Sequence, residues 1–218
     1  MEFYIDSGNT DLIQHYISNF HLKGITCNPA ILIKDQGTIR EVMKAVPKEM
    51  DLYFEVIATE HDGIVEETKK LVSLGENITV KIPATPEGFI AIRKLSREGI
   101  RTLATAVYSV QQAVCAAYNG AKEVAPYISR IDNMGFDGVK TALDIHRIFT
   151  SQNMDCAVFG ASFKTAAQVN EVLMGGINKV TLSADLFGKY IADANGIQAA
   201  EDFKTAWKEA YGTENLII

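Results

Sequence analysis

Eight short runs rich in β-branched and aromatic residues divide this chain at nearly regular intervals, and each is followed by residues with helical periodicity. The runs span residues 3–6, 25–28, 52–58, 78–84, 102–107, 124–128, 157–162 and 180–183. Such alternation is typical of α/β proteins with a parallel sheet. The even pacing favours a single (β/α)8 TIM barrel with a C-terminal helical extension. A doubly wound open sheet is the rival, but no GxGxxG motif follows the first run.

The chain reads as one domain. Its 218 residues contain no linker rich in proline, glycine or serine, so we expect one barrel domain over residues 1–218, with residues from about 186 to 218 forming terminal helices. Residues 199–211 have helical spacing, with Phe203, Trp207 and Tyr211 on one stripe. That stripe needs a surface to cover, and packing on its own barrel is the ordinary outcome.

Charge and targeting signals narrow the class of protein. The formal net charge of −6 gives no broad attraction to nucleic acids or anionic membranes, and we expect neither as a partner. The opening MEFYIDSGNT lacks the basic region and apolar run of a secretory signal, which favours a cytoplasmic protein. The cysteines are not arranged in CxxC pairs and the four histidines lack metal-ligand spacing, so we expect no metal and no cofactor.

Alternation along the runs predicts which side chains share a face, because successive residues of a strand point to opposite sides. In the first run Phe3 and Ile5 share one face, while Tyr4 and Asp6 share the other. The same parity, which includes Gly160 in the seventh run, places a set of polar residues inside the barrel at the carboxyl ends of the strands, where barrel enzymes build their sites. This set is Asp6, Thr26, Asn28, Glu55, Lys81, Thr105, Tyr127 and Ser162.

Lys81 is a single inward lysine in the apolar run ITVKIP. Burial disfavours the ammonium form and supplies the neutral amine that attacks a carbonyl, so Lys81 is a Schiff-base candidate. The alternative interpretation is that Asp6, Glu55 and Lys81 form a buried ion network that only fills the barrel. Desolvating three charges is costly without a further use.

Six ordered motifs resemble those of the small transaldolases and fructose-6-phosphate aldolases, which are class I aldolase barrels. They are FYIDSGN at the first run, GITCNPAI at the second, VKIPATPEG at the fourth, TLATAVYS at the fifth, APYISRID at the sixth and GASFK at the seventh. Each string is short and unspecific alone, but six in this order are hard to obtain by chance. The resemblance covers nearly the whole chain.

The resemblance implies that Lys81 forms the iminium with C2 of a ketose. Asp6 then serves proton transfer and positions the carbinolamine, while Asn28, with Thr26 nearby, holds the donor hydroxyl groups. Breaking the C3–C4 bond leaves a dihydroxyacetone enamine on Lys81 and releases an aldehyde. The resemblance therefore requires Asp6 to lie close to Lys81.

Three further residues match the catalytic companions of that lysine. Glu55 and Thr105 match a pair that orders a water molecule. That water and Tyr127 exchange the proton at the enamine or at the leaving aldehyde. The resemblance thus gives Glu55, Thr105 and Tyr127 a part in proton transfer.

The far end of the sugar needs an anion site. Arg130, Ser162 and Lys164 match the positions that hold the acceptor phosphate in the family, and their guanidinium, hydroxyl and ammonium groups suit a tetrahedral oxyanion. The same donors would hold a sulfonate. The alternative for Arg130 and Lys164 is that they are solvated surface charges.

The chain mixes the signatures of two subfamilies. Tyr127 and Ala125, in the motif APY, are what the fructose-6-phosphate aldolases carry, whereas Glu55 resembles the transaldolases. We give Tyr127 more weight, because its phenol offers a proton to the enamine without an acceptor sugar. The sequence therefore favours an aldolase that forms a ketose phosphate such as fructose 6-phosphate from dihydroxyacetone and glyceraldehyde 3-phosphate, or cleaves it into these two compounds.

Other functions stay open on the sequence. A transaldolase would hand the same three-carbon unit to another sugar phosphate, and a non-catalytic sugar-phosphate binding protein would keep the barrel and anion site without turnover. The resemblance also implies homo-oligomerisation, with a decamer as the expected assembly, because the relatives pack their terminal helix on a neighbouring subunit.

Overall fold

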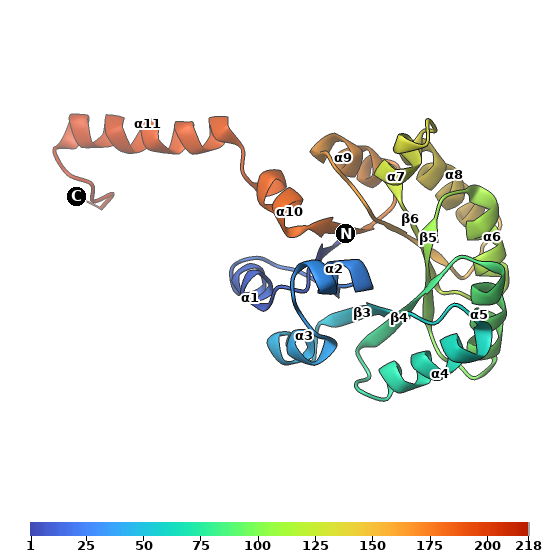
Figure 1. The fold of residues 1–218 in the computed structure, drawn as a ribbon. Coiled ribbons are helices and arrows are strands. Elements are labelled where there is room, and N and C mark those ends of the chain that lie inside the picture. The colour runs from blue at the N-terminus through green and yellow to red at the C-terminus, as the bar shows by residue number, and fades with distance from the viewer. Residues whose placement is uncertain (218) are drawn as a thin grey trace.

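The eight predicted β/α units are present in the computed structural model, which describes residues 1–217, and their parallel strands close into one barrel (Figure 1). Each strand pairs with the next along the chain, and β8 returns to pair with β1. The predicted (β/α)8 barrel is therefore confirmed. The strands are β1 (Glu2–Asp6), β2 (Gly24–Thr26), β3 (Asp51–Glu55), β4 (Ile78–Pro83), β5 (Thr102–Val107), β6 (Glu123–Pro126), β7 (Ala157–Gly160) and β8 (Lys179–Ser183).

The helices begin where side chains cap the free backbone N–H groups. Thr85 caps α5 and Pro86 occupies its first turn, and Thr165 forms a capping box with Gln168 at α9. The helices are α1 (Thr10–Asn19), α2 (Pro29–Lys34), α3 (Ile39–Ala45), α4 (His61–Val72), α5 (Pro86–Arg97), α6 (Val110–Tyr118), α7 (Ile128–Asn133), α8 (Gly138–Ser151), α9 (Ala166–Met174), α10 (Ala184–Ile191) and α11 (Ala194–Tyr211).

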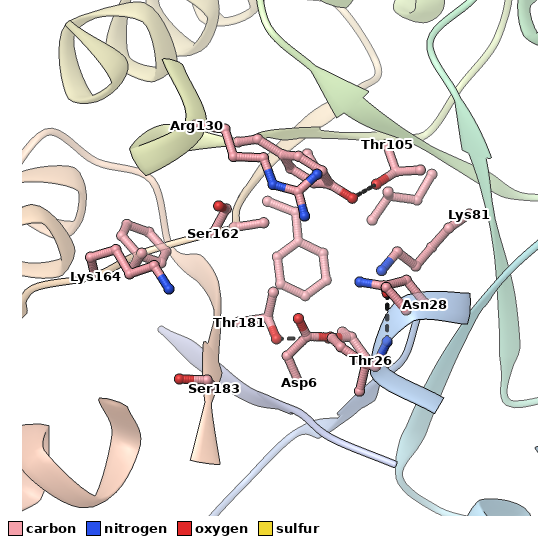
Figure 2. A pocket seen from close by; sticks show the side chains of 18 residues that line it. Asp6, Thr26, Asn28, Lys81, Thr105, Arg130, Ser162, Lys164, Thr181 and Ser183 are labelled. Carbon is pink, nitrogen blue, oxygen red and sulfur yellow. Dashed lines mark hydrogen bonds between the residues drawn. The ribbon is translucent and has the colours of Figure 1, made fainter. Parts of the chain in front are cut away.

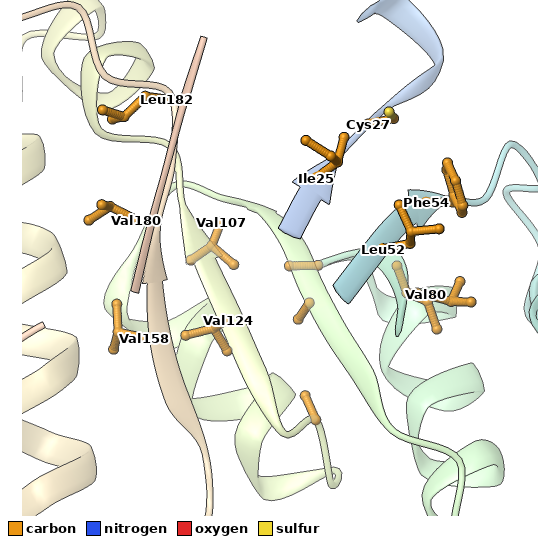
Figure 3. Packing of buried hydrophobic residues seen from close by; sticks show 14 of the residues in the cluster. Ile25, Cys27, Leu52, Phe54, Val80, Val107, Val124, Val158, Val180 and Leu182 are labelled. Carbon is orange, nitrogen blue, oxygen red and sulfur yellow. The ribbon is translucent and has the colours of Figure 1, made fainter. Parts of the chain in front are cut away.

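Apolar side chains on the outer face of the strands pack against the surrounding helices and form the main core (Figure 3). Burying each aliphatic side chain of this kind stabilises the fold by roughly 1.5–3 kcal/mol. Because this layer fixes which face of each strand points outward, it also fixes which residues reach the barrel interior. The layer includes Ile25, Cys27, Leu52, Phe54, Val80, Val107, Val124, Val158, Val180 and Leu182.

The predicted parity of the strands is confirmed in β1 to β6 but not in β7. A second, inner cluster contains the inward residues Tyr4, Tyr53, Leu103, Ala125, Tyr127, Phe159 and Ala161. Because Phe159 and Ala161 face inward, Gly160 faces outward, and the prediction for Gly160 was wrong. A Cβ at Gly160 would lie 2.7 Å from Cζ of Phe163, so the strand can pass there only without a side chain.

Several strands end earlier than predicted. β2 ends at Thr26 and β6 ends at Pro126, because Asn28 and Tyr127 occupy the positions that immediately precede helices α2 and α7. The Asn28 side chain accepts a hydrogen bond from the Ile31 N–H at 3.0 Å. Both residues thus lie beyond the regular strands, although Tyr127 still forms a parallel bridge with Ala161.

The terminal helices extend away from the barrel. α10 still packs on it through Leu186 and Phe187, but α11 contains no buried residue and leads outward from the body of the molecule (Figure 1). Phe203 and Tyr211 of the predicted stripe are exposed. No helix among residues 1–217 combines the length and apolar character needed to cross a membrane.

Candidate active site

A cavity of about 190 Å³ opens at the carboxyl ends of the strands (Figure 2). Most sequence-predicted site residues line it, although they come from six of the eight β/α units. Those lining it are Asp6, Thr26, Asn28, Lys81, Thr105, Ala125, Tyr127, Arg130, Ser162 and Lys164. Glu55 is the exception: it lies beside Lys81 but does not line the cavity.

Lys81 projects from β4 into the cavity and is 6% exposed. Its Nζ donates a hydrogen bond to the backbone carbonyl oxygen of Cys27 at 3.2 Å. Oε2 of Glu55 lies 3.8 Å from Nζ, too far for a normal hydrogen bond. The amine therefore has one close partner, and that partner is uncharged.

The charge state of Lys81 differs from the sequence-based expectation. Burial is the largest single influence and lowers the pKa of Lys81, but Asp6, Tyr127, Glu55 and Cys27 together outweigh it, so that the pKa lies above its usual value. This shift favours the ammonium form of the resting residue. Burial alone does not supply a neutral amine here, and a neighbouring group has to take its proton.

Asp6 is the first candidate for that role. It ends β1 and lines the same cavity, and its Oδ1 accepts a hydrogen bond from Oγ1 of Thr26 at 2.7 Å. Burial raises the pKa of Asp6, while Lys81 and the Thr26 hydrogen bond lower it by less. Asp6 and Lys81 influence each other electrostatically, although no ion pair of 4.0 Å or less joins them in the described structure.

Glu55 provides a second carboxyl group beside the lysine. Burial raises the pKa of Glu55, the nearby charge of Asp6 adds to the rise, and Lys81 opposes it. Its buried Oε2 accepts no hydrogen bond from any of residues 1–217. Two carboxyl groups against one ammonium leave the dry cluster with excess negative charge, which favours binding one more proton.

Thr105 and Tyr127 form a hydrogen-bonded pair on the opposite wall. Their hydroxyl oxygens lie 2.8 Å apart, and both residues are buried. Burial raises the pKa of Tyr127, so its phenol keeps its proton. β5 changes register between Ala104 and Val107, where Ala106 has φ of +52°, so the strand carries an irregularity next to Thr105 and then pairs again at Val107.

Cations and a hydroxyl gather at the outer end of the cavity, as Figure 2 shows for Arg130, Ser162 and Lys164. The Arg130 guanidinium lies over the Tyr127 ring at 4.6 Å and donates to the Tyr108 hydroxyl at 3.4 Å. Ser162 reaches the cavity through a left-handed backbone with φ of +60°, just beyond the end of β7. The three residues can together bind a tetrahedral oxyanion.

The amino-acid sequence matches that of a known group of proteins. The sequence model described as Transaldolase/Fructose-6-phosphate aldolase matches residues 3–215. The chain belongs to this family. Members of the transaldolase/fructose-6-phosphate aldolase family are enzymes, so the family resemblance predicted from the sequence motifs is confirmed.

Solved structures with similar folds come from other proteins. A mutant of flavocytochrome b2 with benzoylformate aligns with a TM-score of 0.66 at 13% identity, over 92% of this chain and 62% of that one. A soluble mutant of (S)-mandelate dehydrogenase from Pseudomonas putida aligns with a TM-score of 0.63 at 12% identity, over 93% of this chain and 72% of that one. This chain spans less than two thirds of the flavocytochrome. At such identity the likeness shows the shared barrel fold alone.

The cavity of this transaldolase/fructose-6-phosphate aldolase family member has walls that the sequence analysis did not single out. Phe159, Ala161 and Phe163 contribute an apolar side, and Thr181 and Ser183 of β8 close the polar one. The parity argument could have found Thr181, because it lies two residues before Ser183 in the eighth run. Among residues 1–217, no three His, Cys, Asp or Glu side chains form a group able to hold a metal ion.

Proposed function

We propose that this family member is a class I aldolase. It cleaves a ketose phosphate such as fructose 6-phosphate into dihydroxyacetone and glyceraldehyde 3-phosphate, and forms the ketose phosphate in the reverse direction. The observation that carries the proposal is the buried Lys81 amine, which enters a cavity whose wall also holds the Tyr127 phenol. A lysine in this setting suits covalent catalysis on a carbonyl. The phenol suits a reaction that has to protonate the remaining enamine.

The first step needs the Lys81 amine to be free of its extra proton. A bound ketose displaces water from the cavity, and a less polar surrounding favours a neutral amine and carboxylic acid over an ion pair. Asp6 accepts this proton in our mechanism, since its pKa is raised by burial. The amine attacks C2, and loss of water from the carbinolamine gives the iminium.

Cleavage then uses the iminium as an electron sink. The C4 hydroxyl gives up its proton, the C3–C4 bond breaks, and its electron pair moves toward the iminium nitrogen, which leaves an enamine on Lys81 and a free aldehyde. In our proposal a water beside Thr105 and Glu55 accepts this proton and passes it to the Glu55 carboxylate, while Tyr127 keeps its own proton for the enamine. The unpartnered Oε2 of Glu55 supports such a water.

Release completes the lyase reaction. The enamine takes a proton at C3 to become an iminium again, and water hydrolyses it to dihydroxyacetone and the free amine. Tyr127 can supply the proton because its raised pKa keeps the phenol protonated until this step and its hydroxyl is held beside Thr105. Asn28 and Thr26 hold the hydroxyl groups of the three-carbon unit, with the small side chain of Ala125 leaving room beside them.

The phosphate end of the sugar would lie among Arg130, Ser162 and Lys164. All three line one end of the cavity, and both cations are exposed enough to receive a ligand from solvent. A sulfonate has the same charge-bearing oxygens as one face of a phosphate. Competition assays with a ketose phosphate and its sulfonate analogue distinguish the two.

Glu55 favours a second candidate, a transaldolase. A carboxylate at this position changes the basicity of the water and the number of protons available to the enamine. The enamine would then persist until an aldose phosphate arrives and accepts the three-carbon unit. Without such an acceptor, fructose 6-phosphate would give at most one equivalent of glyceraldehyde 3-phosphate per active site and no free dihydroxyacetone.

The proposal extends to assembly. α11 carries exposed Phe203 and Tyr211 and buries no residue on its own barrel, so a second copy of the chain is the partner we propose for it, in a homo-oligomer and, by family resemblance, a decamer. Light scattering of the intact chain measures the assembly. A monodisperse monomer would contradict it.

The decisive experiment traps the Schiff base. Sodium borohydride added with dihydroxyacetone should label the peptide that contains Lys81, while the Lys179 peptide of the same molecule stays unlabelled. Fructose 6-phosphate supplied without an acceptor should release free dihydroxyacetone and glyceraldehyde 3-phosphate in equal amounts. Labelling without release favours the transaldolase, labelling without turnover under either condition favours a binding protein, and the absence of labelling contradicts covalent catalysis.

A further inference from the structure

Thr181 makes a buried contact that reaches Asp6 through one intervening hydroxyl. Thr181 faces the barrel interior from β8 and is 7% exposed. Its Oγ1 lies 2.8 Å from Oγ1 of Thr26, whose hydroxyl donates to Asp6 Oδ1 at 2.7 Å. Figure 2 shows Thr181, Thr26 and Asp6 side by side at one wall of the cavity.

The proton count sets the direction of this chain. A threonine hydroxyl has one proton to donate. The Thr26 proton is directed to Asp6, so the hydroxyl that donates in the contact between the two threonines is that of Thr181. The two consecutive hydrogen bonds, from Thr181 to Thr26 and from Thr26 to Asp6, therefore form together only while Asp6 Oδ1 acts as an acceptor.

We propose that Thr181 is a positioning residue for Asp6. Its hydrogen bond prevents the Thr26 hydroxyl from rotating away, keeps Asp6 Oδ1 occupied as an acceptor, and leaves Oδ2 as the oxygen that exchanges protons in the cavity. Oδ2 accepts no hydrogen bond from residues 1–217 in this structure. The role of Asp6 in catalysis rests on the proposed function, whereas the effect of Thr181 on the Asp6 carboxyl does not.

The surroundings of Asp6 determine the sign of the effect. Burial raises the pKa of Asp6, the Thr26 hydrogen bond lowers it, and a donor to Thr26 strengthens that hydrogen bond by polarising its hydroxyl. Loss of the Thr181 hydroxyl should therefore raise the pKa of Asp6. The charged and titratable groups that face Asp6 from other elements are Lys81, Arg130, Asp35, Glu55, Tyr127 and Cys27.

These other groups are left unchanged by a substitution at Thr181. Thr181→Val keeps the shape of the side chain and removes the hydroxyl, while Thr181→Ser keeps the hydroxyl and removes a methyl group. Thr102→Val is the matched control, because Thr102 is fully buried outside the cavity and its hydroxyl has no hydrogen-bond partner among residues 1–217.

The test measures the Asp6 carboxyl directly by carbon NMR titration of protein labelled at aspartate. We expect Thr181→Val to raise the pKa of Asp6 by about 0.5–1 unit, from the size of a single hydrogen bond. Thr181→Ser should restore the wild-type titration, and Thr102→Val should leave it unchanged. An unchanged Asp6 titration in Thr181→Val, or a serine variant that titrates like the valine variant, overturns the proposal.

Kinetics provide the second measurement on the same proteins. Thr181→Val should lower kcat roughly 5- to 20-fold, move the acid limb of the kcat profile to higher pH and leave KM within about twofold. An equal loss of kcat at every pH, with the acid limb in place, contradicts the assigned role. Failure of the wild-type protein to form the borohydride-trapped adduct would instead overturn the proposed function, while the NMR titration still decides the role of Thr181.

Discussion

The barrel interior holds a lysine at each end, and the two are partnered very differently. Lys179 begins β8 at the amino end, where its Nζ lies 2.5 Å from Oε1 of Glu123 and 3.4 Å from Oε2 of Glu2. The rings of Tyr4 and Phe159 lie within 6 Å of the same Nζ, at 5.6 and 5.7 Å. Lys179 is thus surrounded by close charged and aromatic partners.

Lys81, at the carboxyl end, has no carboxylate closer than 3.8 Å and donates its close hydrogen bond to a backbone oxygen. A lysine that is tightly paired stays protonated and stabilises the structure, whereas a loosely paired one can lose its proton when a ligand changes its surroundings. The difference teaches that burial alone does not identify a reactive lysine. The quality of its ion pairing separates the two.

The largest expected effect is the loss of activity in Lys81→Met. Because the other amine of the cavity, Lys164, lies at its outer end, we expect kcat to fall about 10⁴-fold or more. Stability should fall by less than it does in Lys179→Met, because the closest carboxylate lies 3.8 Å from Lys81 Nζ, although the variant leaves Asp6 and Glu55 without their facing ammonium. Steady-state kinetics and urea unfolding measure both. Full turnover in the Lys81→Met variant would contradict the prediction that Lys81 is the reactive lysine and Lys179 the structural one.

Lys179→Met should show the opposite pattern. It leaves the buried Glu123 carboxylate without its cation, so the free energy of unfolding should fall by about 3–5 kcal/mol while kcat of the folded protein stays within about threefold. The control is Lys122→Met, whose exposed ion pair with Asp155 should contribute about 1 kcal/mol or less. Urea unfolding at fixed pH gives the values. Equal losses in both variants would contradict the prediction.

Two tyrosines extend the comparison. Tyr127→Phe should lower kcat about 10²-fold, because it removes the proposed proton donor, with a larger effect on release of dihydroxyacetone than on transfer to an acceptor sugar. Tyr53→Phe is the control at the amino end, where Tyr53 donates to Glu123 at 2.9 Å. It should affect stability and leave kcat unchanged. Parallel assays measure release of dihydroxyacetone and its transfer to an acceptor sugar in each variant. Equal losses of the two activities in Tyr127→Phe would contradict the prediction.

The smallest effect concerns the carboxyl groups. The folded-state pKa of Glu55 is raised by burial, so its charged form opposes folding above that pKa, and the penalty disappears as pH falls below it. Glu55→Gln should therefore raise the free energy of unfolding by about 1 kcal/mol at neutral pH, and less at acidic pH. Glu123→Gln should instead destabilise the protein at neutral pH. Urea unfolding at several pH values tests both signs.

Sequence parity could identify most of the cavity because the outer face of nearly every strand is apolar. Asp6, Lys81 and Thr105 follow from that alternation alone. The alternation failed at Gly160, because a glycine has no side chain that indicates which face it is on. Ser162 enters the cavity through a left-handed backbone conformation instead of by strand parity.

Other features depend on distances that a sequence does not contain. The sequence indicates that Lys81 is buried, but the raised pKa depends on how near Asp6, Tyr127 and Glu55 come to it. The contact of Thr181 with Thr26 joins residues on strands far apart in the sequence. The aromatic stripe of α11 likewise predicts that this helix packs against another surface, but the sequence does not identify that surface.

The hydrogen bond from Lys81 to the carbonyl of Cys27 has an evolutionary consequence. The accepting oxygen belongs to the peptide chain, so no point mutation at position 27 can delete it. Substitutions at position 27 are limited instead by side-chain size, because the Cys27 side chain is packed in the outer core and its thiol donates to the Ser7 carbonyl. A lineage could therefore exchange this cysteine for another small residue and inherit the same anchor for its lysine.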